Sequence, residues 1–149
     1  MADTSGPLFD IGANLLDSQL IKNFDNIVSK SIENNIRRIV ITSSHINDTY
    51  EAKKLIDQHP DILYTTVGFH PHNAKDFSES HFEKMMELCK HEYVKAIGEC
   101  GLDYKRNFSS KDDQIHCFNK HLELATLIDL PMFLHERDAY NDFVILLKD

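Results

Sequence analysis

The sequence lacks long apolar runs, and no stretch approaches the roughly 20 consecutive apolar residues that a helix needs to cross a bilayer. Residues 1–7 also lack the basic and apolar regions of a secretory signal peptide. These absences argue against a membrane partner. We therefore expect a cytoplasmic protein, with the nucleus as the alternative location.

Paired cysteines and an excess of basic residues are missing as well. The three cysteines, Cys89, Cys100 and Cys117, are odd in number and form no CxxC spacing, which argues against a disulfide framework. The chain has 16 basic and 24 acidic residues, for a net charge of -8. This balance disfavours nucleic-acid binding through a broad basic surface. It still permits a local site where metal ions offset phosphate charge.

The composition that remains is that of a soluble globular protein. The 149 residues are 42% hydrophobic and 27% charged. No linker or low-complexity segment divides them, so we expect a single domain over residues 1–149.

A short apolar run followed by a stretch with helical spacing recurs five times along the chain. We expect strands at 7–15, 38–43, 63–70, 95–102 and 131–135. The clearest helical faces are Phe82, Met85, Met86, Cys89 and, later, Ile115, Phe118, Leu122, Ala125. Serines at 78 and at 109–110 stand before acidic residues, as helix N-caps do. The strands begin about 30 residues apart, which predicts parallel strands joined by helical crossovers.

Five such βα units predict an α/β fold with two possible forms. A closed TIM (β/α)8 barrel needs about 250 residues. The chain is therefore either a complete open sheet or the first five units of such a barrel.

Ionisable side chains gather where the expected strands end, which is where parallel α/β sheets bind ligands. They are Asp10, His70, His72, Glu99, Asp103, His135 and Arg137. By strand alternation, Glu99 projects with Ile97 and Gly101, and His135 projects with Phe133 and Arg137. If these faces point inward, Glu99 and His135 converge. Carboxylate oxygen with imidazole nitrogen suits Mg, Mn or Zn.

Each of these residues also has an ordinary structural interpretation. Glu99 could pair with Lys105 or Arg106, and His135 could be a core histidine. His70 and His72 could shape the turn around Pro71, and Asp103 could cap its strand. The remaining histidines, at 45, 59, 81, 91, 116 and 121, fall on loops or helices where we expect solvent exposure. The placement of ionisable groups at the same end of four strands favours a functional site.

At these residues the sequence resembles the TatD family of metal-dependent deoxyribonucleases. The matching strings are FDIGANL at 9–15, VGFHPH at 67–72, AIGECGLDY at 96–104, RNFS at 106–109 and LHERDA at 134–139. They occur in the family's order and cover essentially the whole chain.

The resemblance implies an amidohydrolase-like TIM barrel, here truncated to about five βα units, that degrades DNA from its 3′ end. It implies a site for two divalent metal ions in the complete barrel, with Mg or Mn favoured and Zn as an alternative. Glu99 would be the catalytic metal ligand and His135 the second ligand. His70, His72 and Arg137 would bind substrate phosphates, for which histidine and arginine supply hydrogen-bond donors.

Two departures from the family pattern bear on activity. Many relatives have two metal-binding histidines where this chain has Gly12 and Asn14, although one branch shares the Asp-Ile-Gly-x-Asn string. The family's later ligands, a histidine after strand six and an aspartate after strand eight, would lie beyond Asp149. We therefore expect that this chain alone could be inactive.

Two other functions stay open at this stage. The exposed edge of a fifth strand could invite self-association, which would suit a non-catalytic binding or assembly protein. A related metal-dependent hydrolase of small molecules is the third alternative.

Overall fold

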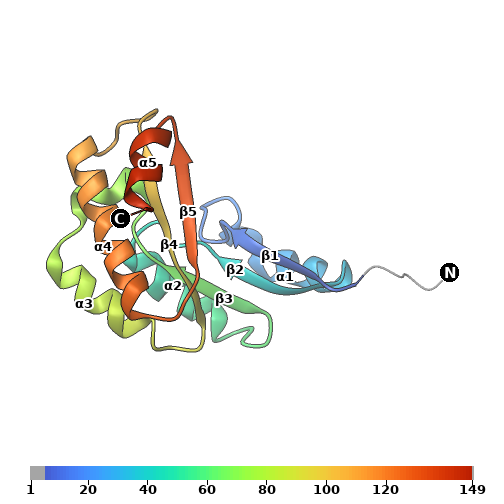
Figure 1. Cartoon of the computed structure of the whole chain (residues 1–149). Helices are drawn as coiled ribbons and strands as arrows, with labels where there is room; N and C mark the ends of the chain where they lie inside the picture. Colours follow the sequence, from blue (N-terminus) through green and yellow to red (C-terminus); the bar gives the residue numbers. More distant parts are fainter. Residues whose placement is uncertain (1–5, 149) are drawn as a thin grey trace.

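The computed structural model describes residues 6–148, in which strands and helices alternate (Figure 1). The strands are β1 (Leu8–Ala13), β2 (Ile36–Ile41), β3 (Leu63–Val67), β4 (Val94–Asp103) and β5 (Met132–Arg137). The α-helices are α1 (Phe24–Glu33), α2 (Ile46–Ile56), α3 (Glu79–Leu88), α4 (Lys111–Leu127) and α5 (Tyr140–Leu146). Two 3-10 helices, η1 (Ile21–Asn23) and η2 (Pro71–Asp76), precede α1 and α3.

All five strands form one parallel sheet in the order β1-β2-β3-β4-β5. The five predicted strands and their helical crossovers are therefore confirmed. Within the described residues, β1 and β5 each pair on one side only and are the edges of the sheet. Because the strands are parallel, the segments that follow them lie together at one end of the sheet.

Some predicted boundaries were wrong by a few residues. β2 begins at Ile36, and β3 ends at Val67 instead of continuing to His70. The chain leaves the sheet at Gly68 and enters η2, in which Pro71 occupies the first turn. Proline suits that position because it has no N–H to donate. The shorter strand puts His70 and His72 in the connection after β3.

The predicted serine caps are confirmed at two helix starts. Ser78 precedes α3, and Ser110 Oγ accepts a hydrogen bond from the backbone N–H of Asp113 at the start of α4. α2 begins instead after His45, and Asp48 accepts a hydrogen bond from the backbone N–H of that residue. These caps satisfy backbone donors that the first helical turn leaves free.

The core lies between the sheet and the helices that cover it. One cluster joins Val67 of β3 and Ile97 of β4 to Met85 of α3 and Leu124 of α4, and all four side chains are buried. Figure 1 shows α3 and α4 on the same side of the sheet.

The buried thiols of all three cysteines are free, as predicted. No helix in the described part of the chain has the length and apolar character that crossing a bilayer requires.

The buried face of α4 differs from the predicted one. Ile115 and Leu122 are only partly buried, whereas Gln114 and His121 are fully buried at its centre. The expectation that His121 is solvated was therefore wrong. Apolar spacing could not reveal this face, because two of its central positions are polar.

The backbone of β4 is irregular beside Glu99. The pairing register with β5 shifts between Gly98 and Cys100. The predicted alternation is therefore wrong in part: Ile97 packs into the helix-side core, whereas Glu99 is partly exposed near His70 and His135. Gly98 and Gly101 have φ of +139° and +141°, a region that side chains rarely adopt.

Candidate metal centre

The structure brings all five predicted site residues together at the carboxyl ends of β3, β4 and β5. Glu99 belongs to β4, whereas His135 and Arg137 belong to β5. His70 and His72 come from the connection after β3. A sixth residue, Asp103 at the end of β4, contacts three of them.

Three side chains meet closely enough to share one ion. One potential ligand atom from each of His70, Glu99 and His135 lies within 4.8 Å of the others. His135 Nδ1 is 3.1 Å from Glu99 Oε1 and 3.3 Å from His70 Nε2. The donor set of two imidazoles and a carboxylate therefore fits a divalent cation.

The ring of His135 stands between two carboxylates. Nδ1 faces Glu99, and Nε2 lies 3.3 Å from Asp103 Oδ2. A neutral imidazole has one N–H and can donate to only one of them. The other contact would place a nitrogen lone pair against a carboxylate oxygen. A divalent cation between them would be bound by both the nitrogen lone pair and the carboxylate.

Asp103 is the member of this cluster that the sequence interpretation understated. Its side chain is fully buried, and its Oδ2 accepts a hydrogen bond from His72 Nε2 at 2.8 Å. Its Oδ1 accepts hydrogen bonds from the backbone N–H groups of Lys105 and Arg106. Burial alone would raise the pKa of Asp103, but these hydrogen bonds outweigh burial and lower the pKa to about 2. Asp103 is therefore ionised at neutral pH.

His70 is oriented by its own turn. Its Nδ1 accepts the backbone N–H of His72 at 3.1 Å, so the proton of the neutral ring lies on Nε2. Burial, followed by the nearby His135 and His72, lowers the pKa of His70 to about 3. His70 consequently presents a neutral Nε2–H group toward Glu99 and His135. This tautomer suits a donor to phosphate, and a metal ligand role would require the proton to move.

The ordinary interpretation of Glu99 is not what the structure shows. Within residues 6–148, the carboxylate of Glu99 instead contacts the imidazole rings of His70 and His135. Lys105 instead lies 3.6 Å from Asp138. Arg137 reaches the same centre, with its Nη1 3.7 Å from Asp103 Oδ2.

Two buried side chains of α4 form hydrogen bonds to the backbone next to the site residues. Gln114 accepts from the backbone N–H of Asp103 and donates to the carbonyl oxygens of Asp103 and Ser109. His121 Nε2 accepts from the backbone N–H of Phe69 at 3.0 Å, and its Nδ1 donates to the carbonyl oxygen of Cys117. Gln114 lies three residues beyond Lys111, and His121 lies seven residues beyond Gln114, so the two share one face of α4. This spacing is the sequence feature that could have suggested that both side chains bind the backbone of the sheet.

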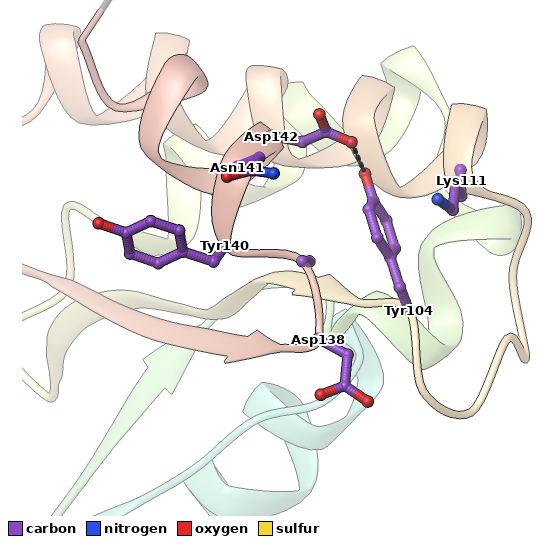
Figure 2. Close-up of a pocket in the computed structure, with 7 residues that line it drawn as sticks. Tyr104, Lys111, Asp138, Tyr140, Asn141 and Asp142 are labelled. Carbon is purple, nitrogen blue, oxygen red and sulfur yellow. Dashed lines mark hydrogen bonds between the residues drawn. The ribbon is translucent and has the colours of Figure 1, made fainter.

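Two pockets open at this end of the sheet, and one of them includes Glu99. One, of about 290 Å³, lies between Glu99 and the ends of β1 and β2, and Asn14 and Thr42 contribute to its lining. The other, of about 440 Å³, lies beside the start of α5 (Figure 2). There, the hydroxyl of Tyr104 donates to Asp142 Oδ2 at 2.8 Å. Burial and the carboxylate of Asp142 raise the pKa of Tyr104.

Solved structures share this fold. A hydrolase of the TatD family from Entamoeba histolytica superimposes with a TM-score of 0.88 and 30% identity, over 97% of this chain and 54% of that one. A TatD homologue from Escherichia coli superimposes with a TM-score of 0.82 at 20% identity, over 95% of this chain and 55% of the other. The five parallel strands therefore form a half-barrel of the TIM-barrel kind, as predicted for five βα units of such a barrel.

Sequence comparison agrees. Proteins named 3′-5′ ssDNA/RNA exonuclease TatD are 38% identical in Erwinia tasmaniensis and 37% identical in Escherichia fergusonii, each over 141 residues. Those residues are 95% of this chain and 54% of each relative, so the chain spans about half the length of these relatives. The family described as TatD related DNase matches residues 9–149. On these grounds the chain belongs to the TatD-related DNase family.

Proposed function

We propose that the chain carries part of the active site of a metal-dependent nuclease that removes nucleotides from the 3′ end of DNA. The observation that carries the proposal is the meeting of His70, Glu99 and His135, whose potential ligand atoms all lie within 4.8 Å of one another. The relatives named as exonucleases support the reaction class. Cations bound at this centre would offset the phosphate charge of the substrate, so the acidic chain would not need a broad basic surface to bind it.

Glu99 and His135 would hold the metal ion, and Glu99 would be the catalytic ligand. Such an ion supplies Lewis acidity toward a phosphoryl oxygen and lowers the pKa of bound water. Asp103 would fix the ring of His135 by accepting its Nε2–H, because metal-binding histidines commonly donate their second N–H to a carboxylate. The ring nitrogen facing Glu99 is then free to bind metal.

His70, His72 and Arg137 would bind the scissile phosphate or its neighbours. The Nε2–H of His70 points to the same space as Glu99. The guanidinium of Arg137, 43% exposed as a side chain, offers several donors in one plane. The free donors of His70 and Arg137, with His72 beside them, favour a phosphodiester over a neutral small-molecule substrate.

We infer Mg or Mn as the metal, with Zn as the alternative, and two ions in a complete barrel. Oxygen and nitrogen donors fit all three metals. Positions 12 and 14 are glycine and asparagine, so strand β1 adds no imidazole ligand here. We also infer a cytoplasmic setting, which the three free cysteines support.

Metal binding and cleavage test this proposal separately. Calorimetric titration with Mn²⁺ should show binding to the chain that Glu99→Ala and His135→Ala each abolish. A 5′-labelled single-stranded oligonucleotide should lose nucleotides from its 3′ end with Mn²⁺, and Glu99→Ala should stop this loss. Glu87→Ala is the matched control, because Glu87 is exposed on α3 and pairs with Lys90. Mn²⁺ binding and cleavage that are both unchanged in Glu99→Ala would refute the assignment.

A second candidate function is self-association through the sheet edges. Side chains of the edge strand β1 are unusually exposed for large apolar residues: Leu8, Phe9 and Ile11 are 55%, 59% and 67% exposed. Edge strands with open backbone groups and apolar side chains favour pairing with another chain. Sedimentation should then show a dimer that Ile11→Lys dissociates. A strictly monomeric wild-type chain would exclude this role.

A further inference from the structure

Phe108 is an exposed aromatic residue beside the metal centre. Its side chain is 56% exposed, and its ring lies 4.8 Å from the ring of His72, at 82°. This edge-on contact places Phe108 directly against a residue that we assign to phosphate binding. A single exposed apolar residue is common on protein surfaces, so exposure alone says little.

The loop that carries Phe108 is held firmly on both sides. Before it, the backbone N–H of Arg106 donates to the buried carboxylate of Asp103. After it, Ser109 is buried and donates through Oγ to the carbonyl oxygen of His72 at 2.9 Å. The carbonyl oxygen of Ser109 accepts a hydrogen bond from Gln114. The exposed ring is therefore presented by a fixed backbone.

The residues around the ring have the composition of a nucleic-acid contact. Lys105, Arg106 and Asn107 precede Phe108 and are all exposed. Two cations next to an exposed ring stand out in a chain of net charge -8. Cationic side chains that follow a phosphate backbone, together with rings that stack on bases, are the usual means of binding single strands.

We propose that Phe108 is a stacking platform for a nucleobase of single-stranded nucleic acid whose phosphate lies at His72 and Arg137. This inference rests on the proposed nuclease function and adds a base subsite to it. A base inside a duplex has both faces covered by its neighbours, so the subsite would select unpaired or terminal bases. It would not discriminate strongly among bases, because each has an aromatic face.

The absence of tryptophan from the sequence makes a direct reporter available. Phe108→Trp keeps an aromatic face and becomes the sole tryptophan of the chain. Oligothymidylate should quench its fluorescence in a saturable manner in EDTA, where metal-dependent cleavage cannot occur. The same backbone carrying abasic residues should cause little quenching. Tyr50→Trp, at a 45% exposed position on α2, is the control and should not respond.

Phe108→Leu separates stacking from simple apolar cover of His72. Leucine retains bulk and apolar character but has no aromatic face. It should weaken oligothymidylate binding about fivefold or more, measured by anisotropy, and leave abasic binding unchanged. Phe108→Tyr should bind as the wild type does.

The outcomes also distinguish this inference from the proposed function. Equal affinity of the wild type for the two oligonucleotides, or wild-type binding by Phe108→Leu, would overturn the base subsite. So would failure of the wild type to bind either oligonucleotide. None of these results bears on Mn²⁺ binding at Glu99 and His135, which calorimetry measures independently.

Discussion

Asp103 and His135 face each other across the boundary between β4 and β5, with Oδ2 3.3 Å from Nε2 on the side of the ring remote from Glu99. Strand pairing brings the two residues near each other, since Asp103 pairs with Arg137 and Gly101 pairs with His135. The backbone of two adjacent strands thus sets the orientation of the candidate ligand.

Replacing Asp103 by asparagine should weaken metal binding without removing a ligand. Asparagine has nearly the same shape, but it supplies no charge to orient His135 as a metal ligand. We expect about 10- to 100-fold weaker Mn²⁺ binding by calorimetry. Asp129→Asn, at an exposed position before β5, should bind as the wild type does. Unchanged affinity in Asp103→Asn would show that this carboxylate does not support the centre.

His121 should make the fold sensitive to acid. Burial lowers the pKa of His121 to about 4, below its ordinary value of 6.5. Between these pH values the unfolded chain binds a proton that the folded chain does not, so stability falls as pH falls from 6.5 to 4. The loss should reach about 3 kcal/mol and level off at lower pH.

His121→Gln tests this assignment. Glutamine has an oxygen that can accept the N–H of Phe69 but does not titrate. Urea unfolding across this pH range should show a smaller loss of stability in the variant than in the wild type. His70, whose pKa is also lowered, acts in the same direction in both proteins and cancels in the comparison. Parallel pH profiles would contradict the prediction.

Gly68 should tolerate no side chain. A Cβ there would lie 2.7 Å from backbone atoms of Gly98, which pairing holds in place. We expect Gly68→Ala to lower the free energy of unfolding by about 1–3 kcal/mol, measured with urea. Gly12→Ala is the matched control. Its Cβ would meet the tip of the Phe133 ring at 2.9 Å, which a small rotation relieves. Equal effects of the two substitutions would be inconsistent with this backbone contact.

Gln114→Ala should destabilise the fold although it removes only a polar side chain. It would leave the N–H and carbonyl groups of Asp103 and the carbonyl of Ser109 without their present partner. Buried unsatisfied groups of this kind cost about 1–3 kcal/mol each, so we expect a loss of at least about 2 kcal/mol on thermal or urea unfolding. His116→Ala, exposed on the same helix, should have little effect.

The sheet was predictable from sequence because its strands are short, apolar and evenly spaced. The clustering of Glu99 and His135 was predictable for a related reason, since parallel strands deliver their carboxyl ends to one place. The prediction of which side chains point to each face of the sheet was less reliable. Alternation assumes a regular strand, and the register shift at Gly98 and Cys100 breaks that assumption beside the key carboxylate.

The buried polar residues were not predictable in this way. Asp103, Gln114 and His121 each resemble a surface residue in sequence, and their burial depends on hydrogen bonds to other segments of the fold. The N–H of Phe69, for example, is bound by a histidine 52 positions later. Such pairs become visible only when α4 is placed against β3 and β4.

The backbone N–H of Glu99 donates to the carbonyl oxygen of Ser43, and Ser43 itself is bound through its hydroxyl to the carbonyl of Thr66. Thr49 of α2 donates to the same serine hydroxyl, so hydrogen bonds to Ser43 join β3, β4 and α2 just beyond the end of β2. We therefore expect the backbone amides around Ser43, Thr66 and Glu99 to exchange hydrogen most slowly. The amides of the outer strands should exchange faster, through local opening. The geometry around Glu99 would then persist while the outer strands fray.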